Sequence, residues 1–159
     1  MKTNVALALA AAGAAALAEA ATLTVGRGEA VTVTADAVYE TVAVHGDLTV
    51  SGACLSLPDG TGGDGQEKTV VSLGADAGDA ATLTVTQGGT FGQTAGKGGI
   101  LEIGANGGWG RVDVLSTKFE AFRMRYLDVA AAARPPDDDP TVLTVGGRVN
   151  LRSLRNRTE

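Results

Sequence analysis

The sequence contains one cysteine, Cys54, and one histidine, His45, among 159 residues. A single thiol cannot build an internal disulfide framework, so packing and backbone hydrogen bonds must stabilise the fold. One histidine with no nucleophile pattern beside it supplies neither a catalytic triad nor a convincing metal site. Cys54 has apolar neighbours in the sequence, and we expect it to be a small buried residue. We expect no catalytic, cofactor-binding or metal-binding residues, and no cofactor.

Paired carboxylates on the expected strands are also lacking. Glycoside hydrolysis needs two carboxyl groups about 5–10 Å apart, whereas the acidic residues expected on outer strand faces are scattered singly: Glu40, Asp47, Glu102 and Asp113. Such isolated charges usually serve solubility and edge protection. The glycine-rich segment 58–67 has three more acidic residues, whose spacing matches neither an EF-hand nor the nonapeptide calcium repeat: Asp59, Asp64 and Glu67. We interpret this segment as a solvent loop and predict that the protein is not an enzyme.

The chain has no surplus of basic charge. It contains 13 Lys and Arg against 18 Asp and Glu, a formal net charge of −5. Because binding to phosphates requires a basic surface, nucleic acid is not an expected partner. Residues 152–159 are locally basic, and we interpret them as a disordered basic tail.

Aromatic residues make up only 4% of the chain, and there are 4 prolines. A sandwich or barrel would usually have a larger aromatic core, so the small aliphatic residues favour a thinner architecture. The segment 134–140 combines prolines with consecutive aspartates and cannot continue a central strand. We expect it to be a loop or linker.

Long apolar runs are absent apart from the N-terminus. Lys2 precedes an apolar, alanine-rich run at 5–17, which is followed by Ala18-Glu19-Ala20. This pattern is typical of a secretory signal peptide, cut after Ala20, and it implies a secreted or cell-surface protein. The run is short for a membrane span, which needs about 20 apolar residues, so we expect none after signal removal. The alternative is an alanine-rich helix that packs on the domain.

Alternating apolar and polar residues are plentiful in the rest of the chain. In Leu23-Thr24-Val25 the two apolar side chains would lie on one face of an extended strand and the threonine on the other. The same alternation recurs at 31–34, 42–44, 55–57, 101–103, 112–114 and 149–151. Glycine, of which there are 23, separates most of these segments. The pattern predicts short strands joined by glycine corners.

The tripeptide Leu-Thr-Val occurs four times, beginning at Leu23, Leu48, Leu83 and Leu143. The spacing between successive Leu-Thr-Val tripeptides is unequal and grows along the chain. It is compatible with coils of roughly 20–30 residues with loop insertions, as in a β-solenoid. We predict an all-β fold, a single-stranded parallel β-helix with short coils, over residues 21–151.

Two features of the sequence resemble the parallel β-helices of bacterial surface proteins. One is the signal-peptide pattern, and the other is the Leu-Thr-Val tripeptide followed by glycines, at 83–89 and 143–147. Such β-helices include autotransporter-type passengers, filamentous adhesins and the wider pectin-lyase-like superfamily. The resemblance covers most of residues 21–151. It implies a right-handed parallel β-helix exposed at or beyond the cell surface, and it carries over no functional residue.

These observations favour a non-enzymatic, exported structural or adhesive module whose partners are surface glycans or other surface proteins. The first alternative is a β-helix fragment that binds or cleaves polysaccharide. It draws on the segment 118–129, where apolar and basic residues alternate: Phe122, Met124 and Tyr126 with Arg123 and Arg125. We expect the apolar set to be core and the arginines to be solvated.

The second alternative is ice binding by a ladder of outward threonines: Thr22, Thr24, Thr32, Thr34, Thr82, Thr84, Thr86 and Thr144. Threonine is also a favoured strand residue in its own right. We expect four residues to interrupt the ladder: Asp47, Glu102, Asp113 and Asn150.

Overall fold

The computed structural model describes residues 22–57, 69–93, 100–118, 121–130, 143–145 and 149–157. For residues 93, 123, 125–130, 143–145 and 149–157 it describes the backbone path alone. The expected signal peptide and the segments 58–67 and 134–140 lie outside the described residues.

Successive strands pass in turn to three stacks. The first stack holds β1 (Thr22–Val25), β4 (Thr41–Val44), β7 (Thr69–Leu73), β10 (Ile100–Ile103) and the second half of β12 (Phe122–Ala130). The second stack holds β2 (Ala30–Val33), β5 (Asp47–Ser51), β8 (Ala80–Thr86), β11 (Trp109–Val114) and β13 (Leu143–Val145). The third stack holds β3 (Ala37–Val38), β6 (Cys54–Leu57), β9 (Thr90–Gln93) and the start of β12. We call three consecutive strands, one from each stack, a layer.

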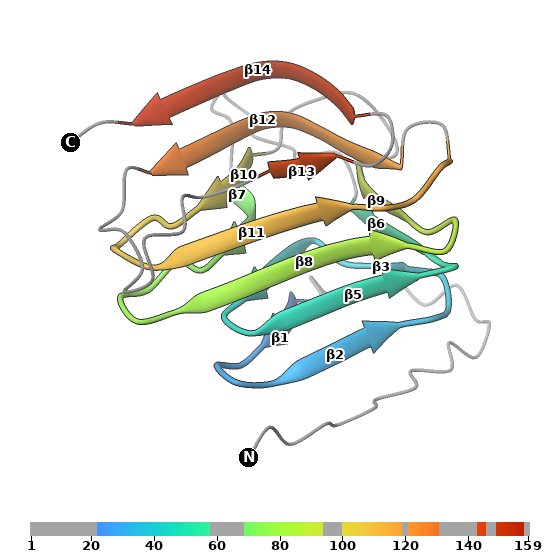
Figure 1. Ribbon diagram of the computed structural model, residues 1–159, viewed down its shortest axis with the longest axis horizontal. Helices are drawn as coiled ribbons and strands as arrows, with labels where there is room; N and C mark the ends of the chain where they lie inside the picture. Colours follow the sequence, from blue (N-terminus) through green and yellow to red (C-terminus); the bar gives the residue numbers. More distant parts are fainter. Residues whose placement is uncertain are drawn as a thin grey trace.

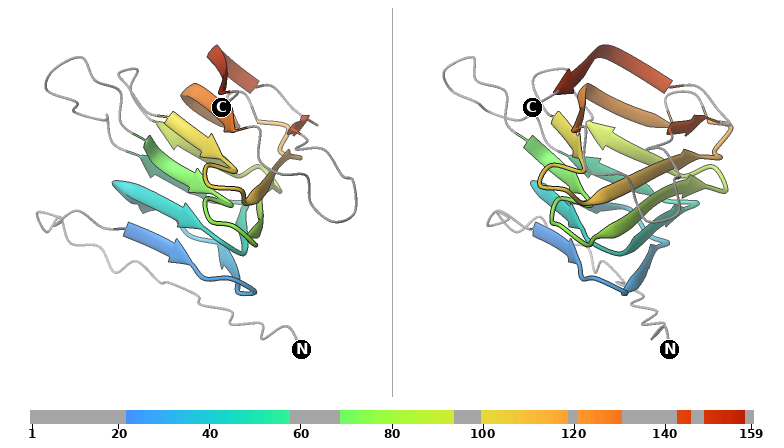
Figure 2. Two further views of the ribbon diagram at one scale, coloured as in Figure 1. Left: turned by 90° about the vertical axis from the view of Figure 1, so that its left-hand side faces the viewer. Right: turned by 60° about the vertical axis from the view of Figure 1, so that its left-hand side comes forward.

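All strand pairings within the described residues are parallel (Figure 1). The second stack is a five-stranded sheet, and β12 joins the first and third stacks into one nine-stranded sheet. The layers rise in sequence order from β1 and β2 to β12 (Figure 2). The expectation of an all-β chain with parallel strands in stacked sheets is therefore confirmed.

In the strands whose side chains are described, alternate residues point into one shared core. In the second stack the inner residues of successive strands are in register: Val31, Leu48, Leu83 and Val112. The last three are fully buried. In the third stack Phe91 lies on Phe122, with ring centroids 5.7 Å apart and the planes 12° from parallel. Like residues thus lie on like, and each buried leucine or phenylalanine contributes about 1.5–3 kcal/mol.

Three of the four Leu-Thr-Val tripeptides lie in strands of the second stack. Leu48 pairs with Leu83, and Leu143 pairs with Val112 one layer further on. Leu23 instead belongs to β1, where it pairs with Val42 in the first stack, although it packs against the same core. The step from Leu23 to Leu48 therefore does not correspond to one layer. The steps from Leu48 to Leu83 and from Leu83 to Leu143 correspond to one layer and two layers.

The corner between the first and second stacks, which we call the first corner, brings backbone segments into close contact. It consists of residues 26–29, 45–46, 74–79 and 104–108 in successive layers. A Cβ atom on Gly46 would overlap the carbonyl oxygens of Gly26 and Glu29, and one on Gly74 would overlap that of Trp109. Glycine is needed at these two positions because another backbone occupies the place of a side chain.

One local expectation differs from the structure. Cys54 is not buried but half-buried, and its Sγ lies 3.2 Å from Ser56 Oγ, because Leu55 and Leu57 take the inward positions of β6. The last two strands belong to different sheets, since β13 pairs with β11 whereas β14 (Val149–Arg157) pairs with β12. β14 extends to Arg157 and so includes most of the segment 152–159 that we interpreted as a tail.

The close contact at Gly46 gives the first prediction. Gly46→Ala should lower the free energy of unfolding by about 3 kcal/mol, because two rigid carbonyl groups must move apart. Gly28→Ala is the matched control: Gly28 has a φ of 74° but no atom near its missing Cβ, so only the backbone penalty of about 1 kcal/mol applies. Urea unfolding followed by circular dichroism measures both. Equal losses would contradict the close contact at Gly46.

Candidate functional site

The first corner repeats one turn in two layers. In the turns Gly26–Glu29 and Asp76–Asp79, the last amide donates to the first carbonyl at 3.0 and 2.9 Å. In each, the carboxylate of the last residue accepts the first residue's amide, at 2.8 Å for Glu29 and 3.0 Å for Asp79. Gly28 and Gly78 have positive φ at the third position, as in a type II turn. The layer between them has only His45 and Gly46 at this corner.

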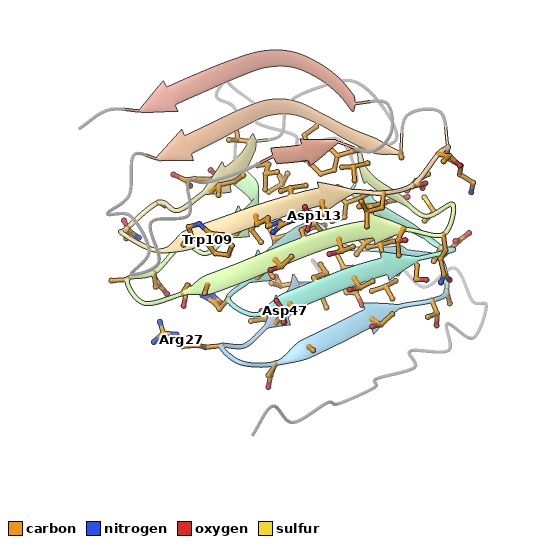
Figure 3. All side chains as sticks on the ribbon, in the orientation of Figure 1. Arg27, Asp47, Trp109 and Asp113 are labelled. Atoms are coloured by element: carbon orange, nitrogen blue, oxygen red, sulfur yellow. The ribbon has the colours of Figure 1, made fainter. Side chains whose placement is uncertain are left out.

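Arg27 and His45 converge on Asp79. Arg27 donates to Asp79 Oδ1 from Nε at 3.0 Å and from Nη2 at 2.7 Å, and Nη2 also donates to the Ala77 carbonyl at 3.1 Å. His45 Nδ1 lies 2.6 Å from Asp79 Oδ2. The Asp79 side chain is 1% exposed. One buried carboxylate therefore links three layers, and Figure 3 shows Arg27 at this edge of the molecule.

The charge of Asp79 follows from these contacts. Burial alone would raise the pKa of the carboxyl, but the Asp76 amide, His45 and Arg27 all donate to it and favour the ionised form. The net result is a pKa below the ordinary value of 3.8. Asp79 is thus a carboxylate at neutral pH, and His45 donates its Nδ1 proton to it because a carboxylate can only accept.

A second carboxylate lies beside this pair. Asp76 Oδ2 is 3.8 Å from His45 Nδ1, and the Asp76 side chain is 62% exposed. One donor atom each from His45, Asp76 and Asp79 lies within 4.8 Å of the others. The group contains an imidazole nitrogen and two carboxylate oxygens, which are ligands for zinc and similar ions. The sequence-based expectation of no metal-binding residues stays a prediction.

The outer face of the second stack, which we call the polar face, carries side chains in register. One row contains Thr32, Thr49, Thr84 and Asp113. The row beside it contains Asp47, Thr82 and Arg111, and Ser51 pairs with Thr86 in a third. Arg111 Nε donates to Asp113 Oδ1 at 2.9 Å. Trp109 begins β11 next to these rows (Figure 3), and its Nε1 is buried with no hydrogen-bond partner among the described residues.

The carboxylates expected singly on outer faces are indeed spread out. Asp47 and Asp113 lie on different rows of the polar face, whereas Glu102 lies in the first stack and accepts from Thr69 at 3.4 Å. Glu40 is exposed between β3 and β4.

The threonines are divided between faces. Thr22 and Thr24 belong to β1 in the first stack, away from the polar face. Of the four interruptions expected in a threonine ladder, Asp47 and Asp113 lie on the polar face, whereas Glu102 and Asn150 belong to the other sheet. Phe122 and Met124 are buried, as expected; the side chains of Tyr126, Arg123 and Arg125 are outside the described set.

Sequence reasoning missed Arg27, Asp76 and Asp79. A signal was present, because Gly28-Glu29-Ala30 and Gly78-Asp79-Ala80 are equivalent tripeptides, each followed by an alternating strand. Aligning these tripeptides, rather than Leu-Thr-Val, would have placed both turns at the same corner.

Comparisons of the chain with protein-family models, with curated proteins and with solved structures gave no match. Among the described residues, no helix has the length and apolar character needed to span a membrane.

The contacts of Asp79 predict a pH-dependent stability. Asp79→Asn should lower the free energy of unfolding by about 1.5–3 kcal/mol at pH 7, because hydrogen bonds to a buried charge are lost. Since folding depresses the Asp79 pKa, its contribution is present above about pH 4 and is lost as pH falls through the folded-state value. Urea unfolding in chelator-containing buffer at several pH values measures the difference between parent and variant. A difference that stays constant from pH 7 to pH 3 would show that the charge is not involved.

Proposed function

We propose that the chain is a β-solenoid, similar to the parallel β-helices of bacterial surface proteins, and that it is an exported, non-catalytic structural or adhesive module. The regular passage of strands through three parallel stacks supports the solenoid architecture. The shared apolar core occupies the interior, so recognition falls to the outer faces and corners. Their chemistry therefore decides which partner the module contacts.

The polar face is the observation that carries the adhesive role. Its rows combine short hydroxyl side chains with a paired guanidinium and carboxylate, and they lie on a rigid sheet. The indole of Trp109 lies at its edge, in register with the small residue Ala80. Hydroxyls and charged groups can bond sugar hydroxyls, and an aromatic ring can pack against the apolar side of a sugar. We therefore propose surface glycans as the partner.

The leading alternative is cleavage of a bound polysaccharide. It requires two carboxylates that act together, and among the described residues Asp47 and Asp113 are the carboxylates on the polar face. A reducing-end assay tests this alternative directly. Release of reducing ends that is lost in Asp47→Asn or Asp113→Asn would replace the adhesive proposal with an enzymatic one.

Glycan binding should depend on Trp109 and Arg111. On a glycan array, Arg111→Ala and Trp109→Ala should each weaken binding about tenfold or more, as expected when an arginine or an aromatic anchor is truncated. Trp109→Phe should retain most binding, because it keeps an aromatic ring, although a smaller one, and the indole N–H that it removes is buried with no partner among the described residues.

The matched control is Thr24→Ala, which alters an exposed threonine on the first stack. It should bind as the parent does. Circular dichroism must show that all variants are folded. If the variants of the polar face bind as the parent does, or if no glycan binds, the adhesive proposal fails.

Export gives a separate prediction. The pattern Ala18-Glu19-Ala20 predicts that a chain expressed with its N-terminus in a secreting bacterium begins at Ala21 after processing. Intact mass spectrometry of the protein outside the cytoplasm measures this directly. Replacement of Ala20 by a bulky residue should leave the precursor uncut, and an unprocessed parent chain would contradict the proposal.

A further inference from the structure

We propose that His45, Asp76 and Asp79 form a binding site for a zinc-like divalent cation at the first corner. The ligand atoms are His45 Nδ1, Asp76 Oδ2 and Asp79 Oδ2, which come from two neighbouring layers. The ion takes the place of the Nδ1 proton, and the neutral imidazole then carries its proton on Nε2. Solvent completes the coordination, since Asp76 is exposed. This site is independent of the proposed function.

The distances are close to those that an ion needs. Ligand atoms about 2.1 Å from a tetrahedral zinc ion lie about 3.4 Å from one another. His45 Nδ1 is 2.6 Å from Asp79 Oδ2 and 3.8 Å from Asp76 Oδ2. To reach that spacing, the distance to Asp79 must increase by about 0.8 Å and the distance to Asp76 must decrease by about 0.4 Å. Rotations of the partly exposed His45 and Asp76 side chains can supply shifts of this size while Asp79 stays in place.

The surroundings hold one ligand in place and leave another accessible. Arg27 fixes the orientation of Asp79 through Oδ1, and the Asp76 amide donates to Oδ2, so the buried carboxylate is held before an ion arrives. His45 is 24% exposed and Asp76 is 62% exposed, which gives the ion an entry path. The group is therefore more than a patch of exposed acids.

The donor set selects the ion. An imidazole nitrogen suits zinc, nickel and copper, whereas calcium and magnesium prefer oxygen ligands alone. With Arg27 at its side, the group has a charge of −1 when His45 is neutral, which favours a divalent cation. Zinc should therefore bind and calcium should not.

Calorimetric titration of the chelator-treated full chain with zinc chloride, paired with thermal unfolding, tests the proposal. All proteins carry Cys54→Ser, so that the lone thiol contributes no zinc ligand. We expect one zinc per chain and a raised Tm with zinc, and no change with calcium. Asp76→Asn should weaken zinc binding at least tenfold while leaving the metal-free Tm unchanged, because the exposed Asp76 carboxylate has no hydrogen bond within the described residues and its 3.8 Å ion pair with His45 is screened by solvent.

Two comparisons complete the experiment. Asp113→Asn, the same chemical change on the polar face, should bind zinc as the parent does, and His45→Gln should lose binding together with Asp76→Asn. No zinc binding up to millimolar concentration would overturn the site. So would undiminished binding in Asp76→Asn, or an equal response to calcium.

Discussion

The constraint on which the structure depends is parallel, in-register stacking of neighbouring backbones. Described strands place their inner residues over those of the neighbouring layer, so Leu48 lies on Leu83 and Phe91 on Phe122. The corners must approach one another as closely as the strands do. Gly46 meets this demand by leaving room for the carbonyls of Gly26 and Glu29, and the same register carries the outer side chains into rows. The buried core and the polar face are thus two consequences of one arrangement.

The strands could be predicted from the sequence because alternation is local. The segments around Val42, Leu55, Leu101 and Val112 all lie in strands, with their apolar residues buried. The register could not be predicted in the same way, since it depends on the length of every corner between two strands. Along the second stack, the interval from Leu48 to Leu83 is much longer than the preceding one, because it contains the segment 58–67. No fixed period therefore appears in the sequence.

The contacts of Arg27, His45 and Asp79 at the first corner were harder to predict than the fold. Arg27 and Asp79 are 52 residues apart, and nothing local marks them as partners. Their contact exists because the layer between them has a short corner, which lets the side chain from one turn reach the next equivalent turn. His45 gave no signal in the sequence for the same reason, since its partners Asp76 and Asp79 come from a turn one layer further along the chain. A single histidine in the sequence is weak evidence against a site when neighbouring layers supply the other groups.

Stability and binding at this corner rest on different residues. Asp79 is buried and accepts hydrogen bonds from three residues. It therefore chiefly links the layers, in a chain that has no disulfide. Glu29 occupies the equivalent place in the first turn, but it is exposed, and no described arginine or histidine contacts it as Arg27 and His45 contact Asp79. Within the described part of the chain, the Asp76 carboxylate accepts no hydrogen bond from another layer and can turn toward His45 or solvent. A corner of this kind can gain a ligand without losing its fold, since the shifts fall on His45 and Asp76 while Arg27 keeps its two hydrogen bonds to Asp79 Oδ1.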